Sequence, residues 1–102
     1  MTEAIRLNPQ DGKSYYVRGS AYRATLKYDR AIEDFRAVLA FAPTLRDMAH
    51  NNLALVYEKL GDDAQALAEY DQAIALNPDA EWLRKNRAAL LRKIEKRKHN
   101  NP

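Results

Sequence analysis

The chain carries one hexapeptide twice, as AIRLNP at residues 4–9 and as AIALNP at residues 73–78, 69 positions later. A more degenerate middle copy ends at Pro43, so three prolines divide the chain at intervals of 34 and 35 residues. Self-similarity at a fixed period of this length is the signature of a repeat architecture, in which each unit packs on its neighbours. The repeat therefore decides the fold before any single helix is assigned.

Other residues recur along the chain at the same interval. Three positions of the first copy and their counterparts 35 residues later are Tyr22, Ala31 and Phe35, followed by Tyr57, Ala66 and Tyr70. The tyrosine and the proline are 21 residues apart in both copies, so the extra residue of the longer interval lies in the turn at 44–47. The two copies are therefore in phase apart from one insertion.

Each period contains two segments of helical length. In the first period, small and aromatic residues recur every three or four positions from Lys13 to Leu26, which predicts one helix. Asp29 is a candidate N-cap of a second helix that reaches Ala42 and stops at Pro43. Because neither helix can bury its apolar stripe alone, we expect an antiparallel pair that stacks on the next pair.

The second period predicts the same arrangement with clearer turn signals. Asp47 is a candidate N-cap of its first helix, and Gly61 is expected to adopt the left-handed conformation that ends this helix. Asp62 or Asp63 is expected to cap the second helix, whose apolar positions continue to Leu76.

The predicted organisation is a single domain over residues 1–98. Its parts are the second helix of an incomplete repeat at 1–9, a first full repeat at 12–45, a second at 47–80 and a capping helix at 81–98, followed by a polar tail at 99–102. Because the first predicted helix lacks one set of neighbours, we expect self-association through this open end.

At the matched positions the chain resembles the tetratricopeptide repeat (TPR) family, whose signature orders an aromatic residue, Leu-Gly, Tyr, Ala, an aromatic residue and Pro. The residues that carry the resemblance are Gly19, Tyr22, Ala31, Phe35 and Pro43 in one copy, and Leu53, Ala54, Tyr57, Gly61, Ala66, Tyr70, Ala73 and Pro78 in the next. Three positions depart from the family pattern, with Arg18 in place of Leu, Leu26 in place of Gly and His50 in place of an aromatic residue. The resemblance implies an all-α fold, a right-handed α-α superhelix (a TPR solenoid) of about two and a half helix pairs with a C-terminal capping helix.

Composition excludes several classes of protein. The 102 residues are 46% hydrophobic and include no cysteine, which excludes disulfide scaffolds, thiolate zinc sites and cysteine nucleophiles. The longest apolar run, residues 37–42, is far shorter than the roughly 20 residues of a membrane-spanning helix. Since no secretory signal is present either, a cytoplasmic location is the default expectation.

The sequence offers little catalytic chemistry. His50 and His99 are the only histidines, and no HExxH motif, glycine-rich phosphate loop or carboxylate pair at ligand spacing accompanies them. His50 is predicted to fill an aromatic position in the repeat core, and His99 lies in the polar tail. We therefore expect no catalytic residue, no cofactor and no metal site, in a protein that is not an enzyme.

Positive charge is concentrated near the C-terminus. The chain has 17 Lys and Arg against 14 Asp and Glu, and residues 84–99 hold eight of these bases and one of the acids. We interpret this segment as the solvated face of a capping helix, with a contact to nucleic acid or anionic lipid as the less favoured alternative. No aromatic side chain is interleaved with the charges, as stacking on nucleic acid bases would require.

Members of the TPR family bind extended or helical peptide segments on the concave surface lined by the first helix of each pair. The resemblance therefore implies a non-enzymatic protein–protein interaction module, a scaffold or adaptor with a peptide groove. The inward-facing candidates are Lys13, Tyr16, Ser20, Arg23, Asn51, Asn52, Leu55, Lys59, Lys85 and Asn86. Cations predominate along the groove, which favours an acidic or amphipathic partner segment. A purely structural, self-associating repeat segment is a further alternative.

One subset of the family clamps the C-terminal carboxylate of acidic chaperone tails with Lys, Asn and Arg side chains from three successive units. The corresponding residues in this chain are Tyr16, Ser20, Asn52, Trp82 and Asn86. Only Asn52 agrees with that set, so the chain is not expected to act as a carboxylate-clamp co-chaperone.

Overall fold

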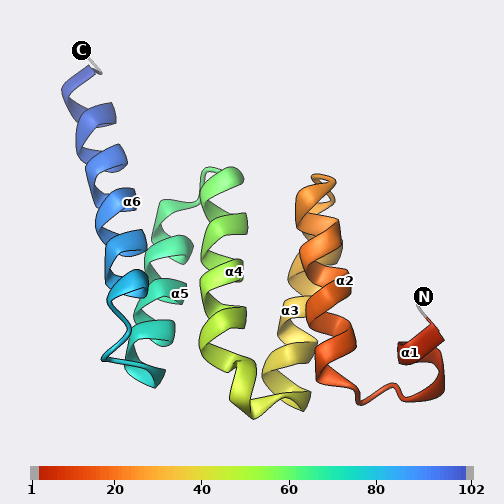
Figure 1. Ribbon diagram of the computed structural model, residues 1–102. Coiled ribbons are helices and arrows are strands. Elements are labelled where there is room, and N and C mark those ends of the chain that lie inside the picture. The colour runs from red at the N-terminus through yellow and green to blue at the C-terminus, as the bar shows by residue number, and fades with distance from the viewer. Residues whose placement is uncertain (1–2, 101–102) are drawn as a thin grey trace.

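The computed structural model describes residues 3–100, and within this part of the chain all regular structure is helical (Figure 1). The elements are α1 (Glu3–Leu7), α2 (Gly12–Ala24), α3 (Tyr28–Phe41), the short 3-10 helix η1 (Pro43–Leu45), α4 (Arg46–Lys59), α5 (Asp63–Leu76) and α6 (Glu81–Asn100). The predicted all-α fold is confirmed. α6 continues through residues 99 and 100 of the segment predicted as a polar tail, and residues 1–2 and 101–102 of the predicted end segments lie outside the described residues.

The helices form antiparallel pairs that lie side by side (Figure 1). α2 packs on α3 and α4 packs on α5, while α3 also packs on α4 and so joins the two pairs. α6 lies against α5 at one end of the stack, and α1 contacts α2 at the other. This is the helical repeat that the sequence predicts, and its Cα dimensions are 53 × 30 × 16 Å. No helix within residues 3–100 is both long and apolar enough to span a membrane.

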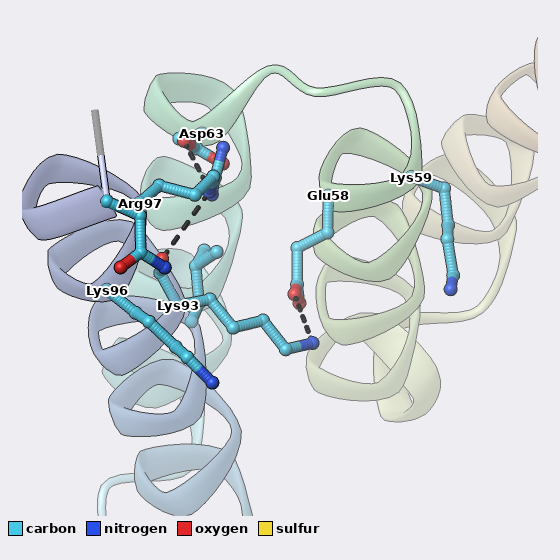
Figure 2. A pocket seen from close by; sticks show the side chains of 8 residues that line it. Glu58, Lys59, Asp63, Lys93, Lys96 and Arg97 are labelled. Carbon is cyan, nitrogen blue, oxygen red and sulfur yellow. Dashed lines mark hydrogen bonds and ion pairs between the residues drawn. The ribbon is translucent and has the colours of Figure 1, made fainter. Parts of the chain in front are cut away.

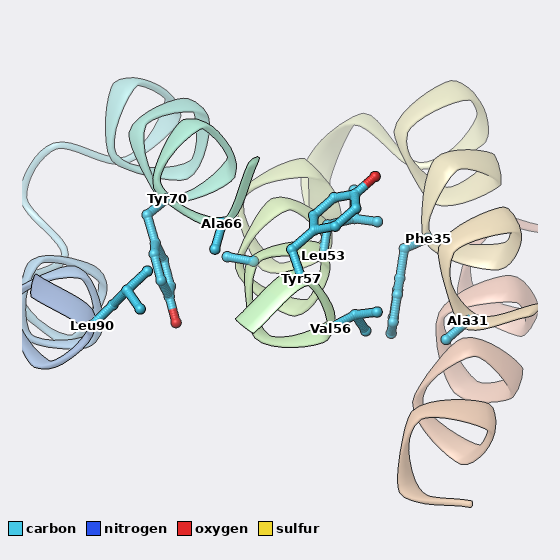
Figure 3. Close-up of a cluster of buried hydrophobic side chains, with 9 residues drawn as sticks. Ala31, Phe35, Leu53, Val56, Tyr57, Ala66, Tyr70 and Leu90 are labelled. Atoms are coloured by element: carbon cyan, nitrogen blue, oxygen red, sulfur yellow. The ribbon is translucent and has the colours of Figure 1, made fainter. Parts of the chain in front are cut away.

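A continuous apolar core runs through the helix pairs (Figure 3). Phe35 of α3, Leu53 of α4 and Tyr70 of α5 are almost completely buried, and Leu90 continues the core into α6. Burial of one large apolar side chain stabilises a fold by about 1.5–3 kcal/mol. The core also contains small residues, which allow the helix backbones to approach closely. They are the fully buried Ala31, Ala54, Ala66 and Ala73.

The two turns inside the helix pairs share a backbone shape but differ in residue type. Gly61, between α4 and α5, has a φ of 79°, which confirms the predicted left-handed turn. Leu26, at the equivalent position between α2 and α3, has a φ of 65° and is 70% exposed. The left-handed conformation costs a residue with a Cβ atom about 1–2 kcal/mol, whereas glycine adopts it freely. The backbone at Leu26 is therefore strained where the family usually has glycine.

One predicted helix cap is confirmed and two are wrong. α3 begins at Tyr28, one residue before the candidate cap Asp29, and its N-cap Lys27 makes no side-chain hydrogen bond to the helix. Asp29 lies in the first turn instead, where its carboxylate favours the positive end of the helix dipole. In α5 the prediction is correct, because Asp62 accepts a hydrogen bond from the backbone N–H of Gln65 at 3.1 Å.

The other incorrect cap is Asp47, which lies inside α4. The 3-10 helix Pro43–Leu45 leads directly into α4, so this helix begins at Arg46, before the residue predicted to cap it. The Asp47 Oδ1 accepts a hydrogen bond from the Met48 backbone N–H at 2.9 Å, and its Oδ2 accepts one from the Asn77 Nδ2 at 3.1 Å. Asp47 therefore links the start of α4 to the end of α5.

Candidate functional site

Side-chain hydrogen bonds join the first helices of the pairs, α2 and α4, to each other and to α6. The Asn52 Nδ2 donates to the Tyr16 Oη at 3.2 Å and so connects α4 with α2. The Asn86 Nδ2 donates to the Asn51 Oδ1 at 3.0 Å and so connects α6 with α4. Four of the predicted groove residues therefore meet, as two hydrogen-bonded pairs, along a surface that extends over three helices. We call this surface the three-helix face.

These four residues are more buried than freely available binding groups would be. Asn51 and Asn52 are 8% and 6% exposed, and the Asn52 Nδ2 also donates to the Met48 carbonyl oxygen at 3.0 Å. The Tyr16 ring packs edge to face on Phe35, with 6.0 Å between the ring centroids. Buried polar groups that have partners add rigidity to the structure around them. The two pairs therefore form the floor of the three-helix face.

The remaining predicted groove residues do not converge on one point. The half-buried ones are Ser20, Arg23 and Leu55, and the exposed ones are Lys13, Lys59 and Lys85. The Arg23 Nε is a buried donor without a hydrogen-bond partner among residues 3–100. The Lys85 Nζ lies 3.6 Å from the Glu81 Oε1 in an exposed pair, and Lys13 lines a hollow of about 240 Å³ beside Ala4 of α1.

A cavity of about 400 Å³ lies between the C-terminal halves of α4 and α6 (Figure 2). Its lining residues are Glu58, Lys59, Asp63, Leu90, Lys93, Lys96, Arg97 and Asn100. Lysine and arginine contribute four of these side chains, and carboxylates contribute two. The cavity is therefore electropositive, and its volume falls in the range of ligand pockets. We call it the basic cavity.

Two ion pairs border the basic cavity. The Lys93 Nζ lies 3.5 Å from the Glu58 Oε1, and the Arg97 Nη2 lies 2.9 Å from the Asp63 Oδ2 (Figure 2). Lys96 extends from α6 and has no ion-pair partner among residues 3–100. Positive charge in the cavity is therefore only partly neutralised.

Tyr70 holds Glu58 from the side of α5. Its Oη donates a hydrogen bond to the Glu58 Oε2. Burial, together with this hydrogen bond, raises the pKa of Tyr70 above its usual value of about 10. The hydroxyl is a donor at neutral pH, and Glu58 therefore has a partner that is independent of Lys93.

Sequence reasoning placed Lys59 in the groove but did not identify Lys93, Lys96 and Arg97 as lining residues. A signal was present, because a spacing of three or four residues puts these cations on one side of a helix. The spacing alone does not show that this side of α6 faces the end of α4. The end of α4 forms the opposite wall of the cavity.

Part of the basic charge of α6 attaches this helix to its neighbours. The Arg87 Nε donates to the Asp71 Oδ1 of α5 at 2.8 Å, in addition to the two ion pairs of the basic cavity. The Arg84 guanidinium also donates to the Pro78 carbonyl oxygen. Acidic residues of α4 and α5 therefore neutralise part of the basic run.

His50 does not fill an aromatic position of the apolar core, which corrects the prediction made from its place in the repeat. Its Nδ1 lies 2.6 Å from the Glu69 Oε1, and both side chains are 15% exposed. A carboxylate partner satisfies the imidazole where an apolar contact would not. Within residues 3–100, no group of three or more His, Cys, Asp or Glu side chains could hold a metal ion.

The stacked helix pairs and the core at repeat positions define an all-α helical repeat protein. Family models described as tetratricopeptide repeat match residues 1–46 and 48–80. The chain belongs to the tetratricopeptide repeat family, whose members are generally protein–protein interaction modules.

Two curated proteins are similar to this chain. It is 33% identical over 79 residues to the tetratricopeptide repeat and J domain-containing co-chaperone DNJ1 of Cryptococcus neoformans var. grubii, and the match covers 78% of the chain. It is 30% identical over 99 residues to the protein O-mannosyl-transferase TMTC1 of Homo sapiens, and this match covers 93% of the chain. The matched regions are only 15% and 11% of the lengths of these two relatives.

Proposed function

We propose that the chain is a non-enzymatic adaptor that binds a peptide segment of a partner protein on the three-helix face. The observation that carries this proposal is the two hydrogen-bonded pairs, Tyr16–Asn52 and Asn51–Asn86, which join α2, α4 and α6. A surface held in place by buried contacts is preorganised, so an incoming peptide need not order the protein as it binds.

Family membership supports the proposal. Protein binding is the general role of tetratricopeptide repeats, and one relative is named as a co-chaperone. In both relatives the matched region is a small part of a longer protein. This is the arrangement expected of a module that brings a partner to a larger assembly.

The charges and apolar contacts of the face favour an acidic or amphipathic partner segment. Arg23 offers a buried Nε donor without a partner among residues 3–100, and Lys13 and Lys85 are exposed cations on α2 and α6. Leu55 of α4 is half-buried and can contact an apolar side chain. Complementary charge increases association rates and selects among partners.

The test is a selection of binding peptides from a displayed library of random sequences, followed by NMR mapping of the best binder on isotope-labelled protein. We expect the chemical-shift changes in α2, α4 and α6 to exceed those in α3 and α5. Changes confined to α3 and α5, or a selection that yields no binder, would contradict the proposal.

A charge-reversal variant tests the preference for acidic segments. Arg23→Glu/Lys85→Glu is expected to weaken the binding of an acidic peptide about tenfold, because two attractive charges become repulsive. The matched control is Lys27→Glu/Lys98→Glu, which changes the net charge equally at exposed positions that are not groove candidates. Equal weakening by both variants would mean that only the overall charge of the protein matters.

A further inference from the structure

We propose that the basic cavity is a subsite for a glutamate or aspartate side chain of the bound peptide. This inference rests on the function proposed above, and it assigns a definite chemistry to one part of the partner segment. Lys93 and Lys96 supply the positive charge, while the aliphatic stems of these two lysines contact an apolar neighbour of the acidic residue. The cavity lies between α4 and α6, two of the helices that form the three-helix face.

Lys96 is one of two lysines of the cavity that make no ion pair among residues 3–100, and Lys59 of α4 is the other. The Lys96 side chain is exposed, and Figure 2 shows it extending from α6 beside Lys93. An ammonium group in this position gains a charge-assisted hydrogen bond when a carboxylate enters.

Lys93 is the second group available to the ligand. Its Nζ is 3.5 Å from the Glu58 Oε1, longer than a strong charge-assisted hydrogen bond, and the Lys93 side chain is 68% exposed. Because the lysine of this pair is exposed and the contact is long, Lys93 can leave Glu58 for an entering carboxylate. Glu58 keeps the hydrogen bond from the Tyr70 hydroxyl when Lys93 turns to an entering carboxylate. The movement therefore leaves no buried carboxylate without a donor.

Arg97 has a different role at the wall of the cavity. Its guanidinium holds Asp63 with contacts of 2.9 Å and 3.0 Å, and the Arg97 Nε donates to the Lys93 carbonyl oxygen at 3.4 Å. The two contacts with Asp63 keep the end of α6 beside the start of α5, so Arg97 shapes the cavity and Lys93 and Lys96 bind the ligand.

The lining favours an acidic side chain over a nucleic acid. Glu58 and Asp63 border the cavity and repel a polyanion whose charges repeat at every nucleotide. None of the lining residues is aromatic, so none offers a surface on which bases stack.

The test measures the fluorescence anisotropy of a labelled peptide of alternating Glu and Leu residues, with both ends blocked so that only side chains carry charge. The matched peptide has Gln in place of Glu. At near-physiological salt we expect the Glu peptide to bind about tenfold more tightly, because screening weakens the charge contacts without abolishing them.

Two double variants distinguish binding in the cavity from nonspecific attraction of an acidic peptide to a basic protein. Lys93→Gln/Lys96→Gln is expected to weaken binding of the Glu peptide about five- to tenfold. The control Lys27→Gln/Lys98→Gln removes the same charge from exposed residues that do not line the cavity, and it is expected to change affinity less than about twofold. All four positions are exposed, and circular dichroism confirms that each variant remains helical.

Several results would overturn the inference. These are equal weakening by both double variants, equal affinity for the Glu and Gln peptides, or no binding of the Glu peptide at all. Displacement of the peptide by a single-stranded oligonucleotide, with the same dependence on Lys93 and Lys96, would assign the cavity to nucleic acid instead.

The same peptide distinguishes failure of the subsite from failure of the proposed function. If Arg23→Glu/Lys85→Glu weakens binding and Lys93→Gln/Lys96→Gln does not, the three-helix face binds peptide and the subsite is wrong. If the Glu peptide does not bind and the library selection yields no binder to the three-helix face, both proposals fail.

Discussion

The guanidinium of Arg18 donates two hydrogen bonds to the carboxylate of Asp34, from Nε to Oδ2 at 2.8 Å and from Nη2 to Oδ1 at 2.7 Å. Asp34 is only 3% exposed, and the Arg18 guanidinium lies 5.7 Å from the ring centroids of both Tyr15 and Tyr22. These hydrogen bonds raise the pKa of Arg18 above its usual value. The pair explains how a charged residue occupies a position that is usually Leu in the TPR family.

Removing one member of this pair is expected to destabilise the fold. Arg18→Ala leaves the Asp34 carboxylate buried without its cation and should lower the free energy of unfolding by about 3 kcal/mol. Replacing both residues by Leu should restore most of this loss, because an apolar pair needs no desolvation of charge. Urea denaturation of the wild type, the single variant and the double variant measures both effects. A loss below about 1 kcal/mol for Arg18→Ala would show that the pair contributes no more than a surface salt bridge.

Leu26→Gly is expected to stabilise the protein. The left-handed conformation at Leu26 costs about 1–2 kcal/mol, and the greater freedom of glycine in the unfolded chain offsets about 0.5–1 kcal/mol of this. We expect a net gain of about 0.5–1 kcal/mol in the free energy of unfolding, measured by urea denaturation.

The reverse change at the equivalent turn is the control. Gly61→Leu should destabilise the protein by about 1 kcal/mol or more. A Cβ atom at Gly61 would meet no atom within 4 Å, so this variant reports backbone strain alone. If Leu26→Gly destabilises the protein, the exposed Leu26 side chain contributes more than its backbone conformation costs.

Gly12→Ala is expected to destabilise the contact between the start of α2 and the end of α3. A Cβ atom at Gly12 would lie 2.4 Å from the Ala42 Cβ, 2.9 Å from the Ala42 N and 3.0 Å from the Phe41 carbonyl carbon. Since two of these atoms belong to the backbone, relief requires the helices to separate, at a cost of about 1–3 kcal/mol. Lys13→Ala, an exposed change in the same turn, is the control, and equal melting temperatures for the two variants would contradict the prediction.

The stability of the protein should fall at high pH because of Tyr70. Its pKa is raised in the folded state, while in the unfolded state it has the usual value of about 10. The contribution of Tyr70 is therefore complete below about pH 10 and is lost as pH rises towards the folded-state pKa, because only the unfolded chain releases the proton. Unfolding free energies of the wild type and of Tyr70→Phe, measured from about pH 9 to 11, should converge as pH rises. Parallel curves would show that Tyr70 titrates normally in the folded protein.

The fold follows from positions that the sequence repeats. Phe35 and Tyr70 occupy one repeat position and are both core residues, and Gly61 adopts the turn predicted for it. The caps were less predictable, because Asp47 was assigned from its residue type alone. η1 leads directly into α4, so α4 begins at Arg46, before Asp47. The residue type of Asp47 does not show where the helix begins.

The contacts of the candidate groove residues could not be predicted from the sequence. The family resemblance implied Asn51 and Asn52 as groove candidates, but it could not show that their amides bond to residues more than 30 positions away. The same limit applies to Asp34, whose partner Arg18 lies on another helix. Spacing indicates which side a residue occupies, whereas its partner depends on how closely two helices pack.

The ion pairs between the end of α6 and its neighbours make the two proposed surfaces differ in their expected sensitivity to salt. The Lys93 and Arg97 pairs involve exposed cations, and dissolved ions screen such pairs, so the final turns of α6 detach more readily as ionic strength rises. The Tyr16–Asn52 pair lies between α2 and α4 and survives that opening. We therefore expect rising ionic strength to open the basic cavity while the Tyr16–Asn52 part of the three-helix face stays in place.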